Sequence, residues 1–170
     1  MRQVILTSFA LVVVLVVHRA GAEQPATALA KLPSYEVLSE RLKLEGVERD
    51  EVITFTVPRD DLLVSQRDIG EIPVAAGMAS TFHFFRCPCG KLNVVGDFLV
   101  ADYEANDVLD ELRQVPDLQI ASIAPVLTQE RPRVLSVRFA GQASADEVAR
   151  AVRAALDRTG EARNQRNPHP

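Results

Sequence analysis

Residues 81–101, TFHFFRCPCGKLNVVGDFLVA, contain the pattern that decides the fold of this chain. Two apolar runs rich in aromatic and β-branched residues, 81–86 and 92–101, flank a short Cys-Pro-Cys-Gly turn. Strand-forming runs that are joined by a short segment with Pro and Gly predict a β-hairpin. The turn also holds both cysteines of the chain, Cys87 and Cys89, so it is the first place to look for reactive chemistry.

The hairpin belongs to a longer alternation of strands and helices. Asp102 can cap a following helix, which Pro116 ends, and a second strand pair is expected at 118–123 and 134–139. Ser144 and Glu147 then form a capping box that starts a last helix. Upstream, the pattern predicts a short helix at 34–44, strands at 52–57 and 62–64, and a loop at 68–77, with Gly160 at the C-terminal end of the last helix.

Each of the two long helices has one apolar stripe and follows a strand pair. Strand-strand-helix, repeated twice, is typical of an α+β domain. We therefore expect a two-layer sandwich in which a mainly antiparallel sheet carries two helices packed on one face, plus the short N-terminal helix. The two halves share an order of elements and no sequence repeat.

The N-terminal residues resemble a secretory signal peptide. Arg2 precedes an apolar run, and the small residues Ala20-Gly21-Ala22 follow it. The run gives a helix of about 21 Å, too short for a hydrocarbon core of about 30 Å, so we expect cleavage rather than stable membrane insertion. The expected organisation is a signal peptide at 1–22, a leader at 23–33, a single domain at 34–160 and a disordered tail at 161–170. The mature protein is then exported, periplasmic or secreted, and soluble.

The charge balance argues against a nucleic-acid partner. The chain has 19 basic and 23 acidic residues, for a net charge of −4. Loss of residues 1–22 removes two arginines and no acid, which lowers the net charge to about −6. Affinity for nucleic acid depends on clustered Lys and Arg, which this composition lacks.

Other chemical motifs are weak. Arg59-Asp60-Asp61 directly follows Pro58 and predicts a turn with solvated charges rather than a metal motif. Alternating aromatic residues at 82–85 are typical of a core strand, although they could line a ligand pocket. The serines lie in no Gly-x-Ser-x-Gly elbow, and His83 is the only histidine within the predicted domain.

Four segments together resemble the LppY/LpqO-like family of exported bacterial proteins, which is built around a domain of unknown function. They are TFTVPRDDLLV at 54–64, GDFLV at 96–100 with the residues that follow it, RPRV at 131–134, and RAALDRTG at 153–160. The resemblance covers roughly residues 44–160. It implies an exported protein whose activity is not settled.

The resemblance also implies a set of histidines that this chain lacks. Family members carry a His-Asn-His run before the Pro-Arg motif and further histidines after the next strand, which would suit a metal site. The corresponding residues here are Ala124, Pro125, Val126, Arg138 and Gln142. An inherited metal centre is therefore not expected, and Asp97 and Glu104 are left as a possible polar site, although carboxylates near a helix start commonly serve as caps.

Cys87 and Cys89 are the candidate chemistry peculiar to this chain. In an oxidising compartment two cysteines in one turn tend to form a disulfide, provided that Pro88 keeps the turn bent. An exposed bridge that closes a very small loop stabilises little and is easily reduced. Alternatively, the two thiolates with His83, or with the thioether of Met78, could bind copper or zinc.

Two functional hypotheses follow. The first is a non-enzymatic exported domain without a cofactor, which binds a small ligand or a protein partner through a pocket or a sheet face. The second is a thiol-redox or soft-metal protein that acts through Cys87-Pro88-Cys89.

Overall fold

The computed structural model describes residues 33–160. The signal peptide, most of the leader and the tail that the sequence predicts lie outside the described residues.

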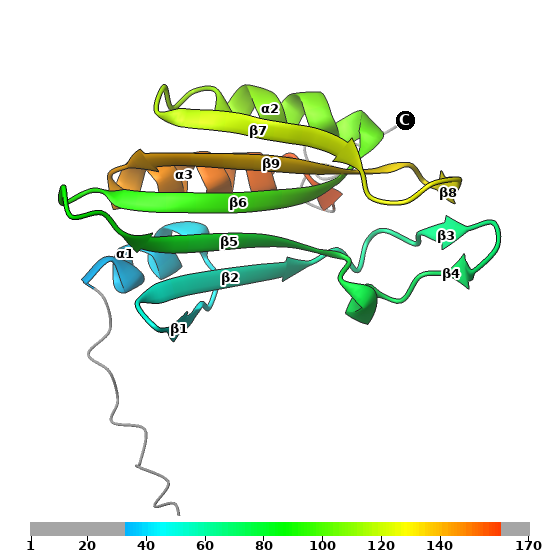
Figure 1. Ribbon diagram of the computed structural model, residues 1–170, viewed down its shortest axis with the longest axis horizontal. Helices are drawn as coiled ribbons and strands as arrows, with labels where there is room; N and C mark the ends of the chain where they lie inside the picture. Colours follow the sequence, from blue (N-terminus) through cyan, green and yellow to red (C-terminus); the bar gives the residue numbers. More distant parts are fainter. Residues whose placement is uncertain (1–32, 161–170) are drawn as a thin grey trace, which may run out of the picture.

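Six strands form the main sheet, and every neighbouring pair in it is antiparallel. Their spatial order is β1-β2-β5-β6-β9-β7 (Figure 1). The bounds are β1 Val47–Arg49, β2 Val52–Pro58, β5 Ala79–Arg86, β6 Leu92–Ala101, β7 Leu118–Pro125 and β9 Val134–Ala143. The predicted hairpin is β5–β6, and the predicted second pair is β7–β9, in which β9 lies beside β6 and β7 forms the outer edge.

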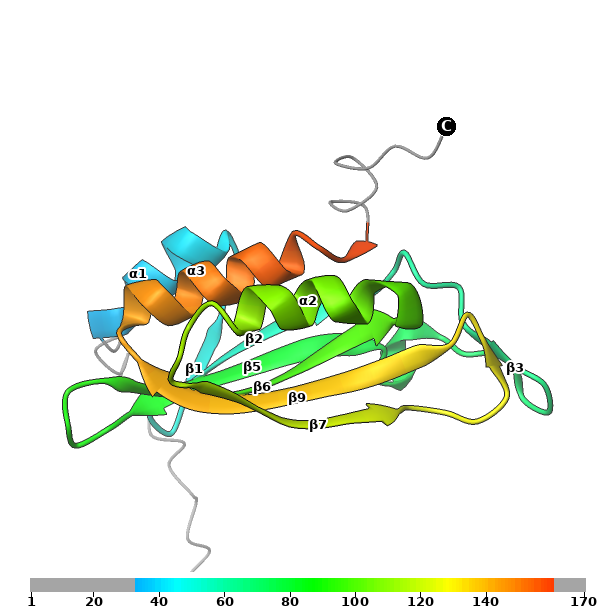
Figure 2. The same ribbon diagram turned by 90° about the horizontal axis from the view of Figure 1, so that it is seen from above.

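Three α-helices lie together on one face of this sheet, and within residues 33–160 no α-helix covers the other face (Figure 2). They are α1 Pro33–Leu42, α2 Ala105–Leu112 and α3 Ala145–Leu156. The expected α+β class is confirmed. Below, the face toward the helices is called the inner face, and the opposite one the outer face.

Side-chain alternation along the hairpin explains why the helices pack on this face of the sheet. Phe82 and Phe84 of β5 and Phe98 of β6 are fully buried there, as is Phe139 of β9 at 1% exposure. Their rings pack at centroid distances of 4.7 Å between Phe82 and Phe98 and 5.7 Å between Phe98 and Phe139. Every second residue of these strands therefore points to the same face of the sheet and makes that face apolar. The apolar stripes of the helices cover it.

A second, smaller sheet lies at one end of the domain, beyond the main strands (Figure 1). It has the order β4-β3-β8, with bounds β3 Ser65–Gln66, β4 Gly70–Glu71 and β8 Glu130–Arg131. The strand expected at 62–64 is wrong: Leu62 and Val64 lie in a loop and are buried in a second apolar cluster. The loop expected at 68–77 contains β4 and a short 3-10 helix, η1 Val74–Ala76.

The capping box at the start of α3 is confirmed. The hydroxyl of Ser144 accepts a hydrogen bond from the Glu147 N–H at 3.3 Å, and the Ser144 N–H donates to the Glu147 carboxylate at 3.1 Å. The Ser144 hydroxyl also donates to the Glu147 carboxylate at 2.7 Å, and this bond, together with the one from the Ser144 N–H, lowers the pKa of Glu147. The cap expected from Asp102 is wrong, because that residue lies inside a 3-10 helix, η2 Asp102–Glu104. There the Glu104 carboxylate accepts the Ala101 N–H at 2.8 Å.

Within residues 33–160, no helix is both long enough and apolar enough to span a lipid bilayer.

Candidate functional site

A groove of about 440 Å³ opens on the outer face, where no helix covers the sheet. It crosses the sheet from the start of β5 to the end of β7. One wall is Leu99, which is 5% exposed and belongs to the second apolar cluster. The lining residues are Gly77, Ala79, Asp97, Leu99, Ser122, Ala124, Pro125, Val126, Ser136 and Arg138.

A row of polar residues crosses four strands at this groove. Thr81 of β5 is paired with Asp97 of β6, Asp97 with Arg138 of β9, and Arg138 with Ser122 of β7. Residues paired directly across antiparallel strands have neighbouring side chains. The row therefore brings a carboxylate, a guanidinium and two hydroxyls to one line across the open face.

Asp97 is the centre of this row. Its Oδ1 accepts a hydrogen bond from the Ser136 hydroxyl at 2.7 Å, and its Oδ2 accepts one from Arg138 Nε at 3.1 Å. The side chain of Asp97 is 30% exposed, and that of Arg138 is 68% exposed. Within the described residues, the two terminal nitrogens of Arg138 make no hydrogen bond. Asp97 thus orients Arg138 and leaves the outer part of the guanidinium available to a ligand.

The groove also gathers positions at which the family resemblance implies histidines. Ala124, Pro125, Val126 and Arg138 all line it, beside Asp97. Gln142 does not line the groove. Its side chain donates instead to the amide oxygen of Asn93 at 3.0 Å. Positions that are far apart in the chain thus line one groove. Apolar side chains and an arginine occupy the positions at which the family resemblance implies histidines.

Glu104 does not belong to this groove. Its side chain is 1% exposed and accepts hydrogen bonds from Arg59 at 2.9 and 3.0 Å and from the Gly160 N–H at 2.8 Å. Together with the bond from Ala101, these contacts tie three separate segments to one carboxylate. The possible polar site of Asp97 and Glu104 is therefore divided by the structure into an open part and a buried part.

The solvated turn expected at Arg59-Asp60-Asp61 is wrong for Arg59, which is 2% exposed. Its guanidinium binds both oxygens of Asp61 at 2.8 Å, binds Glu104, and donates to the Leu99 carbonyl. Burial works to lower the pKa of Arg59, but the hydrogen bonds and charges of Asp61 and Glu104 outweigh it and raise the pKa above its ordinary value. Arg59 is therefore a buried cation held by two carboxylates and one backbone carbonyl.

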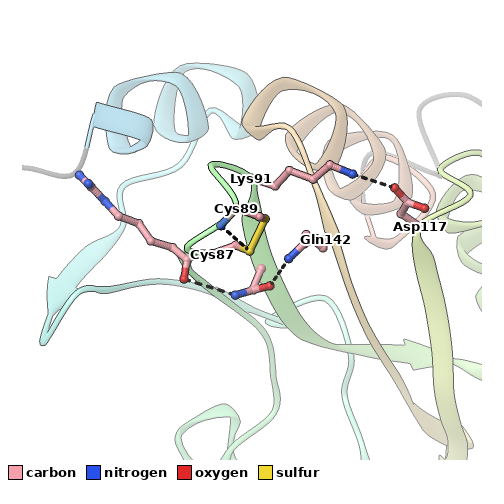
Figure 3. Close-up of a disulfide and its surroundings, with 7 residues drawn as sticks. Cys87, Cys89, Lys91, Asp117 and Gln142 are labelled. Carbon is pink, nitrogen blue, oxygen red and sulfur yellow. Dashed lines mark hydrogen bonds and ion pairs between the residues drawn. A yellow bond between two sulfur atoms is a disulfide. The ribbon is translucent and has the colours of Figure 1, made fainter.

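The cysteine turn lies at the end of the β5–β6 hairpin, opposite the small sheet (Figure 1). Cys87 and Cys89 are drawn there as a disulfide, with their Cα atoms 5.1 Å apart (Figure 3). The Asn93 side chain bridges the base of the turn, donating to the Arg86 carbonyl at 3.3 Å and accepting from Gln142. Of the two residues, Cys89 is exposed and Cys87 is half-buried.

The other expected soft-metal ligands are not gathered at this turn. His83 lies within β5, and its Nδ1 is 3.0 Å from the Thr54 hydroxyl of β2, with which it shares a hydrogen bond. Met78 is 3% exposed and packs in the second apolar cluster. Among the described residues, no three His, Cys, Asp or Glu side chains lie close enough together to hold a metal ion.

The fold and the groove define an α+β domain with one helix-covered and one open sheet face. The chain belongs to the family described as a domain of unknown function (DUF1259), which matches residues 36–158. The match supports an uncharacterised domain family and does not show the LppY/LpqO-like family that the sequence resembles. No curated protein and no solved structure gives a significant match to the chain.

Part of the site could be read from the sequence and part could not. Asp97 was a candidate, but Ser136 and Arg138 were missed as its partners because they lie on β9, and only the β6–β9 register joins them. A signal was nevertheless present. Ser136 and Arg138 alternate with the apolar residues of a core strand, which places them together on its solvent-facing side.

Proposed function

We propose that this is an exported, non-enzymatic domain that binds a small organic molecule in the outer-face groove. The observation that carries the proposal is the position of Asp97, Ser136 and Arg138 in one hollow, next to the positions where the family resemblance implies a metal site. Export is inferred from the signal-like residues 1–22. A groove on a sheet face that no helix covers is open to a ligand without any rearrangement of the core.

The chemistry of the groove favours a ligand with an acidic group and an apolar body. Arg138 is held through Nε, which leaves the paired N–H groups of its terminal nitrogens to bind a carboxylate or sulfonate in bidentate fashion. The side chains of Leu99, Ala124 and Val126 supply the apolar wall. Ligand sites commonly combine a mainly apolar lining with a few placed polar groups.

Binding is favoured over catalysis by the way the polar groups are used. The hydroxyl of Ser136 donates its proton to Asp97, so the carboxylate orients it and no histidine is adjacent to take that proton. His83 does not line the groove, and its Nδ1 is engaged with Thr54. A serine nucleophile is usually activated by an adjacent histidine, and no histidine is among the lining residues of the groove.

A fluorescent organic anion tests this proposal directly. The probe 8-anilinonaphthalene-1-sulfonate combines a sulfonate with aromatic rings, and we expect it to bind the folded protein with an increase in fluorescence. Ala124→Trp should abolish this increase by filling the groove from the exposed edge strand. Arg138→Gln should weaken binding about tenfold, because a charge-assisted hydrogen-bond pair to the sulfonate is lost.

Arg113→Gln is the matched control. Arg113 is another exposed arginine in an ion pair, 63% exposed and 3.5 Å from Asp110, but it follows α2 on the helix side of the domain. Its substitution should leave probe binding unchanged. Equal binding by the wild type and all three variants would show that the probe binds elsewhere and would remove the support for the groove.

A second candidate function is thiol-disulfide exchange through Cys87 and Cys89, in which the pair is a disulfide in the exported protein. It is favoured by the position of both cysteines in one exposed turn with their Cα atoms 5.1 Å apart, within the range that a disulfide requires. The copper or zinc alternative with His83 has less support, because that imidazole lies within the strand and is engaged with Thr54. Elemental analysis of the purified protein, with its thiols counted, distinguishes thiol-disulfide exchange from copper or zinc binding.

A further inference from the structure

The two cysteines of the turn are held differently. Cys87 is fixed at the end of the hairpin, where its N–H donates to the Lys91 carbonyl at 3.0 Å and its carbonyl accepts the Gly90 N–H at 3.0 Å. Cys89 lies within the turn between these anchor points and is exposed, whereas Cys87 is half-buried. An incoming reagent therefore reaches the Cys89 sulfur more easily.

A hydrogen bond marks Cys87 as the sulfur that better carries negative charge. The backbone N–H of Cys89 donates to the Sγ of Cys87 at 3.1 Å. Hydrogen bonds to the charged form of a group stabilise that form, and thiolates are stabilised in the same way by nearby cations. Cys87 lines a hollow of about 390 Å³ that Arg86 and Lys91 also line. The charge of Lys91 is partly compensated by Asp117 at 3.4 Å.

From these two asymmetries we propose that a dithiol reductant attacks Cys89 Sγ and that Cys87 leaves as the thiolate. The inference rests on the second candidate function and assigns the role of each sulfur within it. In thiol-disulfide exchange, the sulfur whose thiolate is more stable leaves faster, and the accessible sulfur is the one attacked.

The exchange is balanced as two displacements. A thiolate of the dithiol forms a bond to Cys89 Sγ, the bond between the two cysteines breaks, and its electron pair goes to Cys87 Sγ. The second thiol of the reductant, as its thiolate, then attacks its own sulfur in the mixed disulfide and releases Cys89 as a thiolate. The reductant leaves oxidised as a disulfide, and the protein has gained two electrons and, after protonation, two thiols.

Trapping with glutathione tests the assignment. A brief exposure to glutathione, quenched with acid before a second thiolate attacks the mixed disulfide, preserves that species, and alkylation with peptide mass spectrometry locates it. We expect glutathione on Cys89 and the alkyl group on Cys87 in at least tenfold excess over the reverse arrangement. Equal amounts, or glutathione mainly on Cys87, would overturn the assignment while leaving the redox function intact.

Single-cysteine variants provide a second readout. Cys89→Ser keeps the backbone N–H that contacts Cys87, whereas Cys87→Ser leaves Cys89 without such a donor. Alkylation of Cys89→Ser by iodoacetamide should therefore persist to lower pH than alkylation of Cys87→Ser, and identical pH profiles would contradict the proposal. If glutathione and dithiothreitol both fail to open the bridge in the folded wild type, the second candidate function fails, and the variants still decide which thiol is activated.

Discussion

Replacement of Glu104 by alanine is expected to destabilise the domain by about 3–5 kcal/mol, the largest effect of any single substitution discussed here. The reason is that Arg59, which is 2% exposed, would keep its charge in a buried position with Asp61 as its one remaining charged partner among the described residues. The Ala101 and Gly160 N–H groups would lose their acceptor as well. Urea unfolding followed by circular dichroism measures the change in the free energy of unfolding.

Two further variants separate the loss of the pair from the cost of an unpaired charge. Asp110→Ala removes a partner from an exposed pair with Arg113 and should cost less than about 1 kcal/mol. The double variant Arg59→Met/Glu104→Leu removes both buried charges and should be more stable than Glu104→Ala, because the one partner left unpaired, Asp61, is 22% exposed and not buried. A Glu104→Ala protein as stable as Asp110→Ala would contradict the buried network.

Replacement of Gly96 by valine is expected to destabilise the domain by about 1–3 kcal/mol through overpacking. Gly96 lies on the inner face of β6, where a Cβ would overlap the ring of Phe139 and approach Phe82 Cδ1 to 3.0 Å. The rings of Phe82 and Phe139 are 0% and 1% exposed, so they lie in a packed core that leaves little room for them to move aside. Thermal and urea unfolding of the variant measure this cost.

Phe139→Leu serves as the compensating change. Alone it should destabilise the core, because it removes ring contacts with Phe82 and Phe98. Combined with Gly96→Val it should cost less than the sum of the two single effects, since the smaller side chain makes room for the new one. Strict additivity would show that Gly96 is not required for the packing of Phe139.

The sequence predicts the parts of this fold that local pattern determines. Alternation and turn residues identify the β5–β6 hairpin, and Ser144 with Glu147 identifies the start of α3. It does not predict the small sheet, because its strands are two residues long and Ser65 pairs with Arg131 through long-range contact alone. The same limit explains Arg59: a charged residue after a proline is normally solvated, and only the tertiary position of Glu104 stabilises it in the core.

The candidate sites can likewise be predicted from the sequence only where their residues are close together in the chain. Cys87 and Cys89 are two residues apart, so their proximity is visible in the sequence. Asp97 was also recognised, but its role could not be, because Ser136 and Arg138 approach it only after β9 joins β6. The groove itself depends on the position of the second apolar cluster, which includes Leu99 and Val134, and no local pattern specifies that cluster.

Methyl-labelled NMR with the organic anion tests the groove most directly. On titration with 8-anilinonaphthalene-1-sulfonate, the methyl signals of Ala79, Ala124 and Val126, which line the groove, should shift together. Those of Ala151 and Val152, which face the core from α3, should stay in place. Arg138→Gln should reduce the shifts at equal probe concentration. Shifts confined to the helix side, or spread evenly over the domain, would contradict the assignment of the outer-face groove as the binding site.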